Sequence, residues 1–237
     1  LHSLRRRQRQ MCIRDSYHYV RSYMLGRKAR LVAREAHRKR GRLLDIGTGT
    51  GYFADTMARR GWKVEAVEKS PQARAFAKEH FDLDVKPESA LKEFAPGSFD
   101  VITLWHVMEH LEHLNETWEM LRELLTEKGM LIVAVPNCSS YDAGRYGEYW
   151  AAYDVPRHLW HFTPVTIQQL ASRHGFIMAA RHPMPFDAFY VSMLSEKHRG
   201  SSCSFLKGMY AGTLAWFSTL GRKERSSSMI YVFRKKR

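Results

Sequence analysis

A glycine-rich loop stands between an apolar run and a helical run, and its residues could hold a nucleotide. Leu43 to Ala54 reads LLDIGTGTGYFA, which predicts a strand, a tight turn and the start of a helix. Glycine lets the backbone approach a ligand closely, and the free N–H groups of the first helical turn bind polar ligand groups. Glu68 ends the next apolar run, 17 positions after Gly51. A carboxylate placed there can accept hydrogen bonds from two ribose hydroxyls, so the pattern predicts a nucleotide-type cofactor.

Two residues favour S-adenosylmethionine over a dinucleotide. The dinucleotide pattern G-x-G-x-x-G requires glycine at position 52, where this sequence has Tyr52. Asp45 stands just before the loop, and its carboxylate suits a ligand that carries an ammonium group. The sequence therefore predicts that S-adenosylmethionine binds and that NAD does not.

Trp105 and His106 follow an apolar run at 99–104 that is expected to form the fourth strand. Ligands of open α/β sheets bind beyond the carboxyl ends of the strands, so both residues are predicted to face the sulfonium and the acceptor. An aromatic ring beside a sulfonium gains cation–π energy of about 1 kcal/mol. Large aromatic side chains are also commonly core residues, and this alternative stays open for Trp105.

Histidine residues are the candidates for proton transfer, because histidine titrates near neutral pH and can act as a general base. Each of them could instead be a packed or surface residue without a chemical role. Arg157 could bind an acceptor carboxylate or phosphate, or pair with an acid of its own loop. The candidate catalytic residues are His106, His110, His158 and His161.

The segment from His106 to His110 reads HVMEH, which matches the H-x-x-E-H signature of one class of zinc peptidases. That signature requires a long helix that places both histidines on one face. Residues 101–104, directly before it, have the character of a strand. The sequence therefore predicts that this motif binds no metal.

Apolar runs alternate with helical runs along most of the chain. This order predicts right-handed β-α-β crossovers and a Rossmann-like α/β sandwich of three layers, with a mostly parallel seven-stranded sheet. One domain is expected over 17–237, with a helical lead-in at 17–41 and an insert at 183–228 before the last strand. The expected strands are 42–46, 62–67, 84–86, 99–104, 130–135, 175–181 and 229–233.

Residues 43–135 resemble the class I methyltransferases, in the broad group that includes the ubiquinone-pathway O-methyltransferases. The matching segments are LLDIGTGTG, the strand end at Glu68, GSFDVITLWHVMEHL at 97–111 and LLTEKGMLIVAVPN at 124–137, followed by YDVPRHLWHFTP at 153–164. The resemblance implies an enzyme that uses S-adenosylmethionine. The residues expected around this cofactor are Asp45, Gly47, Thr48, Gly49, Gly51, Tyr52, Phe53, Glu68, Lys69, Ser89, Ala90, Trp105 and His106.

The expected acceptor is a small, largely apolar molecule that could be lipid-linked, and O-methylation is favoured. It is predicted to bind between residues 150–162, which are rich in aromatic and titratable side chains, and the insert. Residues 205–220 carry one charge and are too few to span a bilayer. This stretch could lie on a membrane surface, cover the acceptor, pack on the sheet or form an oligomer contact.

The formal net charge of +14 keeps a nucleic-acid methyltransferase open as an alternative. Residues 6–15 (RRQRQMCIRD) resemble a translated sequencing adapter, so residues 1–16 are predicted to lie outside the domain. Without them the net charge is +10. The N-P-P-Y-type segment typical of base-amine methylation is absent after the fourth strand, where LWHV stands, which argues against a nucleic-acid acceptor. A non-catalytic nucleotide-binding or membrane-peripheral protein of the same fold is a further alternative.

Composition also bears on where the protein works. No run of about 20 apolar residues is present, and the first residues do not form a secretory signal. Cys12, Cys138 and Cys203 are scattered, which fits a reducing compartment rather than a disulfide framework. The expected location is the cytoplasm, with contact to a membrane surface left open.

Overall fold

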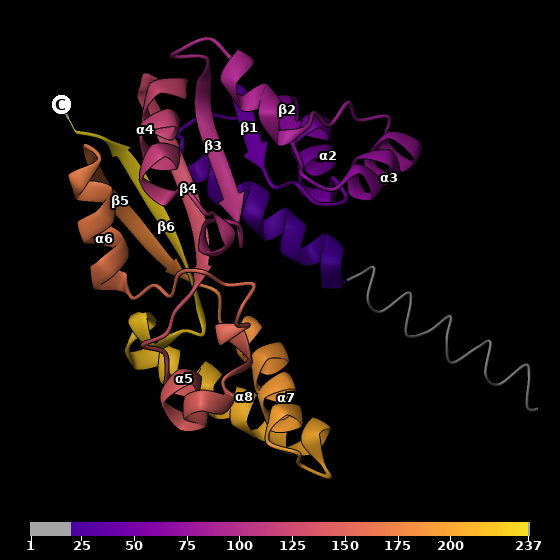
Figure 1. The fold of residues 1–237 in the computed structure, drawn as a ribbon, viewed down its shortest axis with the longest axis vertical. Helices are drawn as coiled ribbons and strands as arrows, with labels where there is room; N and C mark the ends of the chain where they lie inside the picture. The colour runs from indigo at the N-terminus through magenta and orange to yellow at the C-terminus, as the bar shows by residue number, and fades with distance from the viewer. Residues whose placement is uncertain (1–19, 237) are drawn as a thin grey trace, which may run out of the picture.

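The computed structural model describes residues 20–236, which form a central sheet with helices packed around it (Figure 1). The predicted extension at 1–16 lies outside these residues. In chain order the helices and strands are a helix at 20–35, β1 (Arg42–Ile46), α2 (Tyr52–Arg59), β2 (Lys63–Val67), α3 (Pro71–Phe81), β3 (Phe99–Trp105), α4 (Leu114–Leu124), β4 (Leu125–Pro136), α5 (Tyr141–Tyr146), α6 (Pro164–Arg173), β5 (Phe176–Pro183), α7 (Asp187–His198), α8 (Ser204–Gly221) and β6 (Ser228–Lys235).

The sheet has the strand order β2-β1-β3-β4-β6-β5. Neighbouring strands from β2 to β4 are parallel, whereas β6 runs antiparallel to both β4 and β5. The mostly parallel Rossmann-like sheet predicted from the sequence is therefore present. Because the carboxyl ends of the parallel strands meet at one edge, the residues that follow β1, β2 and β3 come together there.

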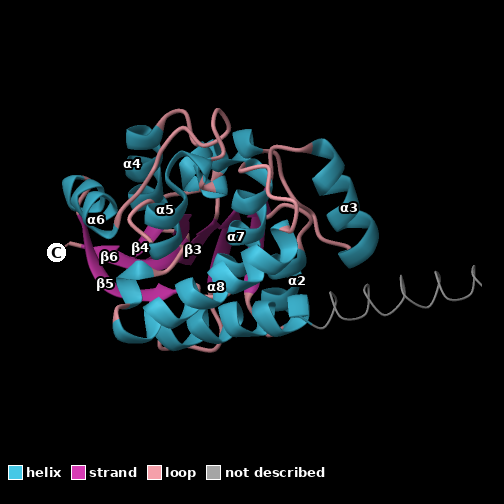
Figure 2. Ribbon diagram, turned by 90° about the horizontal axis from the view of Figure 1, so that it is seen from below, coloured by secondary structure: helices cyan, strands magenta, loops and turns pink. Residues whose placement is uncertain are grey.

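Alternate residues of the strands point to opposite faces of the sheet, which produces three layers. On one face, Leu44 and Ile102 belong to a core cluster with side chains of α4 and α6. On the other face, Leu43 and Val101 pack with α2 and with the helix at 20–35. Figure 2 shows helices on both sides of the strands.

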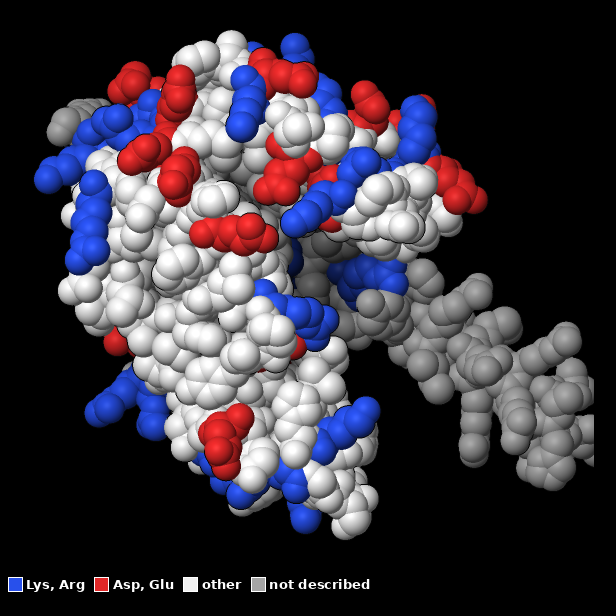
Figure 3. Space-filling model, viewed as in Figure 1, with Lys and Arg blue, Asp and Glu red and all other residues white. Residues whose placement is uncertain are grey.

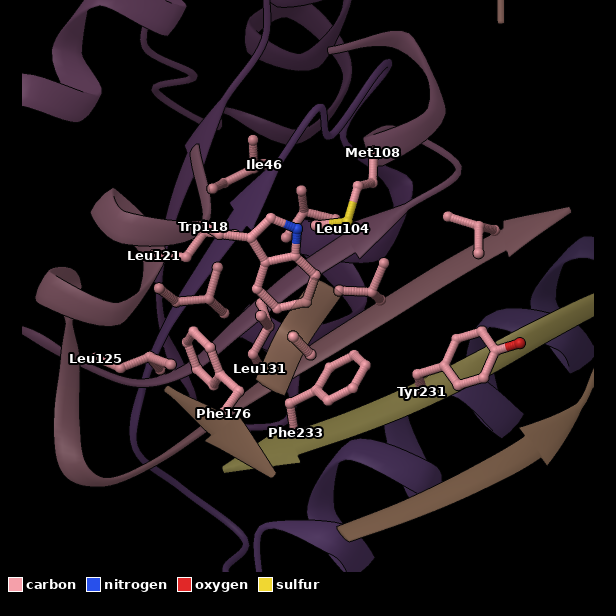
Figure 4. Packing of buried hydrophobic residues seen from close by; sticks show 14 of the residues in the cluster. Ile46, Leu104, Met108, Trp118, Leu121, Leu125, Leu131, Phe176, Tyr231 and Phe233 are labelled. Carbon is pink, nitrogen blue, oxygen red and sulfur yellow. The ribbon is translucent and has the colours of Figure 1, made fainter. Parts of the chain in front are cut away.

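Trp118 of α4 lies at the centre of the larger core cluster. Its indole is fully buried and contacts the rings of Phe176 and Phe233 edge-on, with ring centroids 5.4 Å apart in both pairs. Figure 4 shows these rings and the aliphatic side chains of β3 and β4 around it. The buried aromatic ring joins α4 to both β5 and β6.

The sheet has six strands within residues 20–236, so the predicted count of seven is wrong for the described part of the chain. Residues 84–86 form only one bridge, between Lys86 and Val67 at the end of β2. Pro87 follows directly, and proline has no N–H to continue a ladder. The predicted strand is therefore reduced to a single paired residue beside β2.

The insert folds into a hairpin of two helices, α7 and α8, which lies with α5 beyond the carboxyl ends of β3 and β4 (Figure 1). Glycines let the two helices approach closely: a Cβ on Gly208 would lie 2.5 Å from the Cα of Met193, and a Cβ on Gly212 2.7 Å from the Cα of Phe189. Among the residues that the structure describes, no helix is both long and apolar enough to cross a membrane.

Candidate functional site

The glycine loop after β1 has a backbone that side chains would disturb. Gly47, Gly49 and Gly51 have φ angles of 67°, 58° and 84°, in the left-handed region that favours glycine. A Cβ on Gly47 would lie 2.5 Å from Cγ2 of Val107, whereas a Cβ on Gly49 would meet nothing within 4 Å. The loop is therefore packed on one side and open on the other, which leaves room for a ligand beside its backbone.

Glu68 meets this loop in space although it lies 19 residues from Gly49 along the chain. One carboxylate oxygen accepts a hydrogen bond from the N–H of Gly49, and the other accepts one from the N–H of Ser70, both at 2.9 Å. Each oxygen has a further lone pair for a ligand. The structure thus brings together the loop and the acid that the sequence assigned to one cofactor.

A cavity of about 970 Å³ lies at this edge of the sheet. Of the residues predicted to surround the cofactor, it is lined by Gly47, Glu68, Lys69, Ser89 and His106, and His110 lines it as well. The other predicted residues do not line it: Asp45, Thr48, Gly49, Gly51, Tyr52, Phe53, Ala90 and Trp105. Sequence reasoning missed its further lining residues, which are Ile46, Val67, Glu88, Leu91, Lys92, Val107, Leu111, Glu112, His113, Glu116, Thr117 and Met120.

Asp45 of β1 is buried directly behind the glycine loop. One of its oxygens accepts a hydrogen bond from Oγ1 of Thr103 at 2.6 Å, and the other has no hydrogen-bond partner among residues 20–236. Burial raises the pKa of Asp45 to about 6. A buried carboxylate with a free oxygen would gain from a cationic partner.

His106 directly follows β3 with a φ of 58°, and its imidazole lies between two carboxylates. Nδ1 is 3.5 Å from Oε1 of Glu109, and Nε2 is 3.5 Å from Oδ2 of Asp187 at the start of α7. Burial acts to lower the pKa of His106, but the two carboxylates outweigh it and raise the pKa to about 9. His106 is therefore positively charged at neutral pH, so it can donate a proton but is a poor general base there.

We expect this charge to make stability depend on pH. A histidine with a raised pKa contributes stability that is complete below its unfolded-state pKa of about 6.5 and is lost as the pH rises through about 9. The side chain is 34% exposed, so solvent screening limits the expected loss to the order of 1 kcal/mol. Urea unfolding at pH values from about 6 to 10 measures this loss of unfolding free energy. The variant Asp187→Asn should flatten the pH dependence, and an NMR-titrated pKa of His106 near 6.5 in the unmodified protein would contradict the assignment.

Trp105 contacts a lysine rather than the cavity. Nζ of Lys28, from the helix at 20–35, lies 4.3 Å from the centroid of the indole, and Phe53 packs against the same ring at 5.2 Å. Burial lowers the pKa of Lys28, while the nearby charges of Asp187 and Asp45 act to raise it. A lysine ammonium thus occupies the ring face where the sequence predicted a sulfonium.

Lys28 also lines a second cavity, of about 700 Å³, between the helix at 20–35 and the residues that follow β5. Sequence reasoning missed both Lys28 and Asp187, because each lies in a run with no distinguishing motif.

The remaining predicted histidines are held by backbone carbonyl groups. Nδ1 of His110 lies 2.9 Å from the carbonyl oxygen of Arg157, and Nδ1 of His158 lies 2.9 Å from that of Ala152. Nε2 of His161 lies 3.0 Å from the carbonyl oxygen of Tyr153. The rings of His110 and His158 contact each other with centroids 4.6 Å apart. Neither His158 nor His161 lines the 970 Å³ cavity.

The zinc-peptidase arrangement is absent from this region of the structure. His106 follows β3 in a left-handed conformation, and only residues Met108–His110 form a single 3₁₀ turn. The two histidines of HVMEH therefore do not share a helix face. Arg157 pairs with Asp154 at 2.7 Å within its own loop, which is one of the two alternatives open from the sequence.

The predicted acceptor position between residues 150–162 and the insert needs a correction. Trp150 is buried in a cluster with Val191 of α7 and Ala211 of α8. Its Nε1 donates a hydrogen bond to Asp142 at 2.8 Å. Phe162 is buried in the main core. Trp150 therefore packs against the hairpin and leaves no open space at its position, whereas Phe162 packs against the sheet.

Comparison with known proteins agrees with this geometry. A family model described as a methyltransferase domain matches residues 17–180. The mitochondrial ubiquinone biosynthesis O-methyltransferase of Schizosaccharomyces pombe is 35% identical over 101 residues, which are 39% of this chain and 37% of that protein. The ubiquinone biosynthesis O-methyltransferase of Cereibacter sphaeroides is 30% identical over 158 residues, 62% of this chain and 64% of that protein. The matches thus span about a third to two thirds of these relatives.

Solved structures share the fold at low sequence identity. A SAM-dependent methyltransferase from Archaeoglobus fulgidus superposes with a TM-score of 0.61 and 19% identity, over 91% of this chain and 94% of that chain. Phosphoethanolamine N-methyltransferase 2 of Haemonchus contortus, solved in complex with S-adenosyl-L-methionine, has a TM-score of 0.55 and 21% identity. The match covers 83% of this chain and 49% of that chain. The family match covers well over half of the chain, and with the shared fold it establishes that this protein belongs to the methyltransferase domain family, as its sequence predicted.

Proposed function

We propose that the protein transfers the methyl group of S-adenosylmethionine to an oxygen of a small, largely apolar acceptor. The observation that carries this proposal is the meeting of the glycine loop and Glu68 at a cavity of about 970 Å³ that extends to His106 and His110. The relatives named ubiquinone biosynthesis O-methyltransferases support an oxygen acceptor. Glu68 would hold the ribose, and Ser89 would lie on the adenine side.

The residues of this chain would act mainly by positioning. Methyl transfer is a displacement at the sulfonium carbon, and holding the two reactants in line can supply about 7–11 kcal/mol. Positively charged His106, fixed by Asp187 and Glu109, would stabilise negative charge that develops on the acceptor oxygen. Nδ1 of His110 faces a carbonyl oxygen and therefore carries the proton, so Nε2 is free to accept a proton from the acceptor.

The charges around the cavity favour a small acceptor over a nucleic acid. Its lining includes four acidic residues, whereas a site for a polyanion concentrates Lys and Arg. On the face shown in Figure 3, acidic and basic residues are interspersed. The acidic lining residues are Glu68, Glu88, Glu112 and Glu116.

The exposed apolar side chains of α8 favour a lipid-linked acceptor. Phe205, Leu206, Phe217 and Leu220 of this helix are 56–68% exposed. Arg222, Lys223 and Arg225 follow the helix directly. An exposed apolar helix with basic residues at its end binds at the surface of anionic membranes. We therefore propose peripheral membrane contact through α8 of a cytoplasmic protein.

The test is a methyl-transfer screen with labelled S-adenosylmethionine. Quinols, phenols, fatty acids and lipid-linked sugars are compared with tRNA, rRNA and duplex DNA. We expect label in a phenol or quinol, with a rate at least about 10²-fold lower in His110→Ala if that residue is the base. Label only in nucleic acid, with steep salt dependence, would refute the acceptor class. Cofactor binding without transfer to any acceptor would favour the non-catalytic alternative.

A further inference from the structure

The second cavity, of about 700 Å³, is lined by basic and apolar side chains and by no acidic one. It shares no lining residue with the 970 Å³ cavity at the glycine loop. Small-molecule sites in proteins commonly have volumes in this range, with a largely apolar lining and a few polar groups that orient the ligand. The basic lining residues are Arg27, Lys28, Arg30, Arg34 and His182.

Three arginines form a row on the helix at 20–35. Arg27 and Arg30 are three residues apart and Arg34 follows four residues later, so their side chains are neighbours on the helix surface. Like charges at these spacings destabilise a helix. A negatively charged ligand between the arginines would remove this repulsion, so the row indicates an anion site.

The positive charge is concentrated at one end of the cavity. Oε1 of Glu35 lies 2.8 Å from Nη2 of Arg34 and 3.2 Å from Nε2 of His182, which balances the charge at their end. Within residues 20–236, neither Arg27 nor Arg30 forms an ion pair with an acidic side chain. An anion would therefore bind at the end of the cavity where these two arginines lie.

The two arginines have N–H groups available for such an anion. Cζ of Arg27 lies 5.9 Å from the ring centroid of Tyr23 and 5.7 Å from that of Phe186. An aromatic face attracts a guanidinium without accepting conventional hydrogen bonds from it. Nε of Arg30 donates to the carbonyl oxygen of Gly26 at 3.3 Å, which leaves its two terminal nitrogens. Each guanidinium can then donate two parallel hydrogen bonds to a phosphate.

Lys28 adds a third cation to the cavity, and it is less exposed than the two arginines. Its Nζ lies 4.3 Å from the indole centroid of Trp105. Burial lowers the pKa of Lys28, while the charges of Asp187 and Asp45 act to raise it. An anion in the cavity would also favour the charged form of this lysine.

We propose that the second cavity binds a phosphomonoester whose organic part is aromatic or otherwise apolar. A dianionic phosphate matches three neighbouring cations better than a single carboxylate does, and guanidinium groups recognise it by paired hydrogen bonds. The cavity is larger than a phosphate group, and the residues that follow β5, from Pro183 to Phe186, form an apolar wall for the rest of the ligand. This ligand is distinct from S-adenosylmethionine, and its binding does not depend on the proposed methyl transfer.

The test is a calorimetric titration of the full chain with phenyl phosphate, with and without saturating S-adenosylhomocysteine. That compound would occupy the glycine loop and the helix N-terminus after it, which could otherwise bind a phosphate. We expect one equivalent of phenyl phosphate per chain in both titrations, weaker binding of inorganic phosphate, and no binding of phenol. Arg27→Gln and Arg30→Gln should each weaken the binding of phenyl phosphate by about tenfold or more.

Arg173→Gln is the matched control, because Arg173 is an exposed arginine at the end of α6 that does not line the cavity. It should bind phenyl phosphate as tightly as the unmodified protein. Arg27 and Arg30 are also exposed, and their replacement removes like-charge repulsion. The melting temperatures of Arg27→Gln and Arg30→Gln without ligand should therefore be no lower than that of the unmodified protein.

Three results would overturn the proposal. The unmodified protein could fail to bind phenyl phosphate at millimolar concentrations, or S-adenosylhomocysteine could displace it, which would place the phosphate at the glycine loop. Arg27→Gln and Arg30→Gln could also bind phenyl phosphate as tightly as Arg173→Gln does. A fourth titration uses a single-stranded oligonucleotide without terminal phosphates. Tighter binding of this oligonucleotide than of phenyl phosphate, lost in the same two variants, would assign the row of arginines to nucleic acid and overturn the proposal as well.

Discussion

Gly47→Ala is expected to lower the free energy of unfolding by about 3 kcal/mol. Alanine in the left-handed conformation costs roughly 1–2 kcal/mol. Its Cβ would also lie 2.5 Å from Cγ2 of Val107, and overpacking of this kind typically adds about 1–3 kcal/mol. Urea unfolding measures the change. Val107 follows His106 directly, so the displaced residue would also disturb the end of β3.

Gly49→Ala is the matched control. Gly49 also has a left-handed φ, 58° against 67° for Gly47, but a Cβ there would meet nothing within 4 Å. We expect a loss of only about 1–2 kcal/mol and a weaker affinity for S-adenosylmethionine in calorimetry, because the methyl group extends into the space beside the loop. Equal destabilisation in the two variants would show that contact with Val107 is unimportant. An unchanged affinity of Gly49→Ala for S-adenosylmethionine would argue against binding of the cofactor at this loop.

Gly212→Val is expected to destabilise the protein by about 2–3 kcal/mol. A Cβ at position 212 would lie 2.7 Å from the Cα of Phe189, and backbone cannot move aside as a side chain can. The helices α7 and α8 would have to separate. Because Asp187 begins α7 and faces His106 at 3.5 Å, we also expect the pKa of His106 to fall from about 9 toward its ordinary value.

Thermal unfolding and an NMR titration of His106 measure the two effects. Gly221→Val is the control, because Gly221 is the last residue of the same helix and a Cβ there would meet nothing within 4 Å. The free energy of unfolding of Gly221→Val should differ from that of the unmodified protein by less than about 0.5 kcal/mol. A stable Gly212→Val protein with an unchanged His106 titration would mean that the hairpin is not what positions Asp187.

The cofactor side of the site was predictable because its signals are local. The glycine loop, the strand before it and the helix after it lie within a dozen residues, and Glu68 ends the next strand along the chain. Parallel strands place such ends at one edge without further information. The order of strands and helices, and therefore the layered fold, followed from the same alternation of apolar and amphipathic runs.

The acceptor side depends on contacts between distant segments, which periodicity does not encode. Asp187 reaches His106 because the insert folds back as a hairpin, and Lys28 covers Trp105 because the helix at 20–35 packs on that face. Trp150 had the aromatic character of a ligand pocket but fills a core between three helices. The contact between the rings of His110 and His158 likewise depends on a hydrogen bond from the N–H of Leu159 to the carbonyl oxygen of Glu109, 50 residues away along the chain.

The position of β6 has a consequence for folding kinetics. It lies between β4 and β5, and β5 has no other neighbour in the sheet. Arg234 pairs with Met130 across 104 residues of chain, so both interfaces of β6 require loop closures of high contact order, which are slow. Until β6 docks, the aliphatic run of β4 has an unpaired edge and β5 has no strand partner, so both strands can associate between chains. Refolding at high protein concentration should therefore compete with aggregation, and a chain cut before Ser228 would retain both exposed edges.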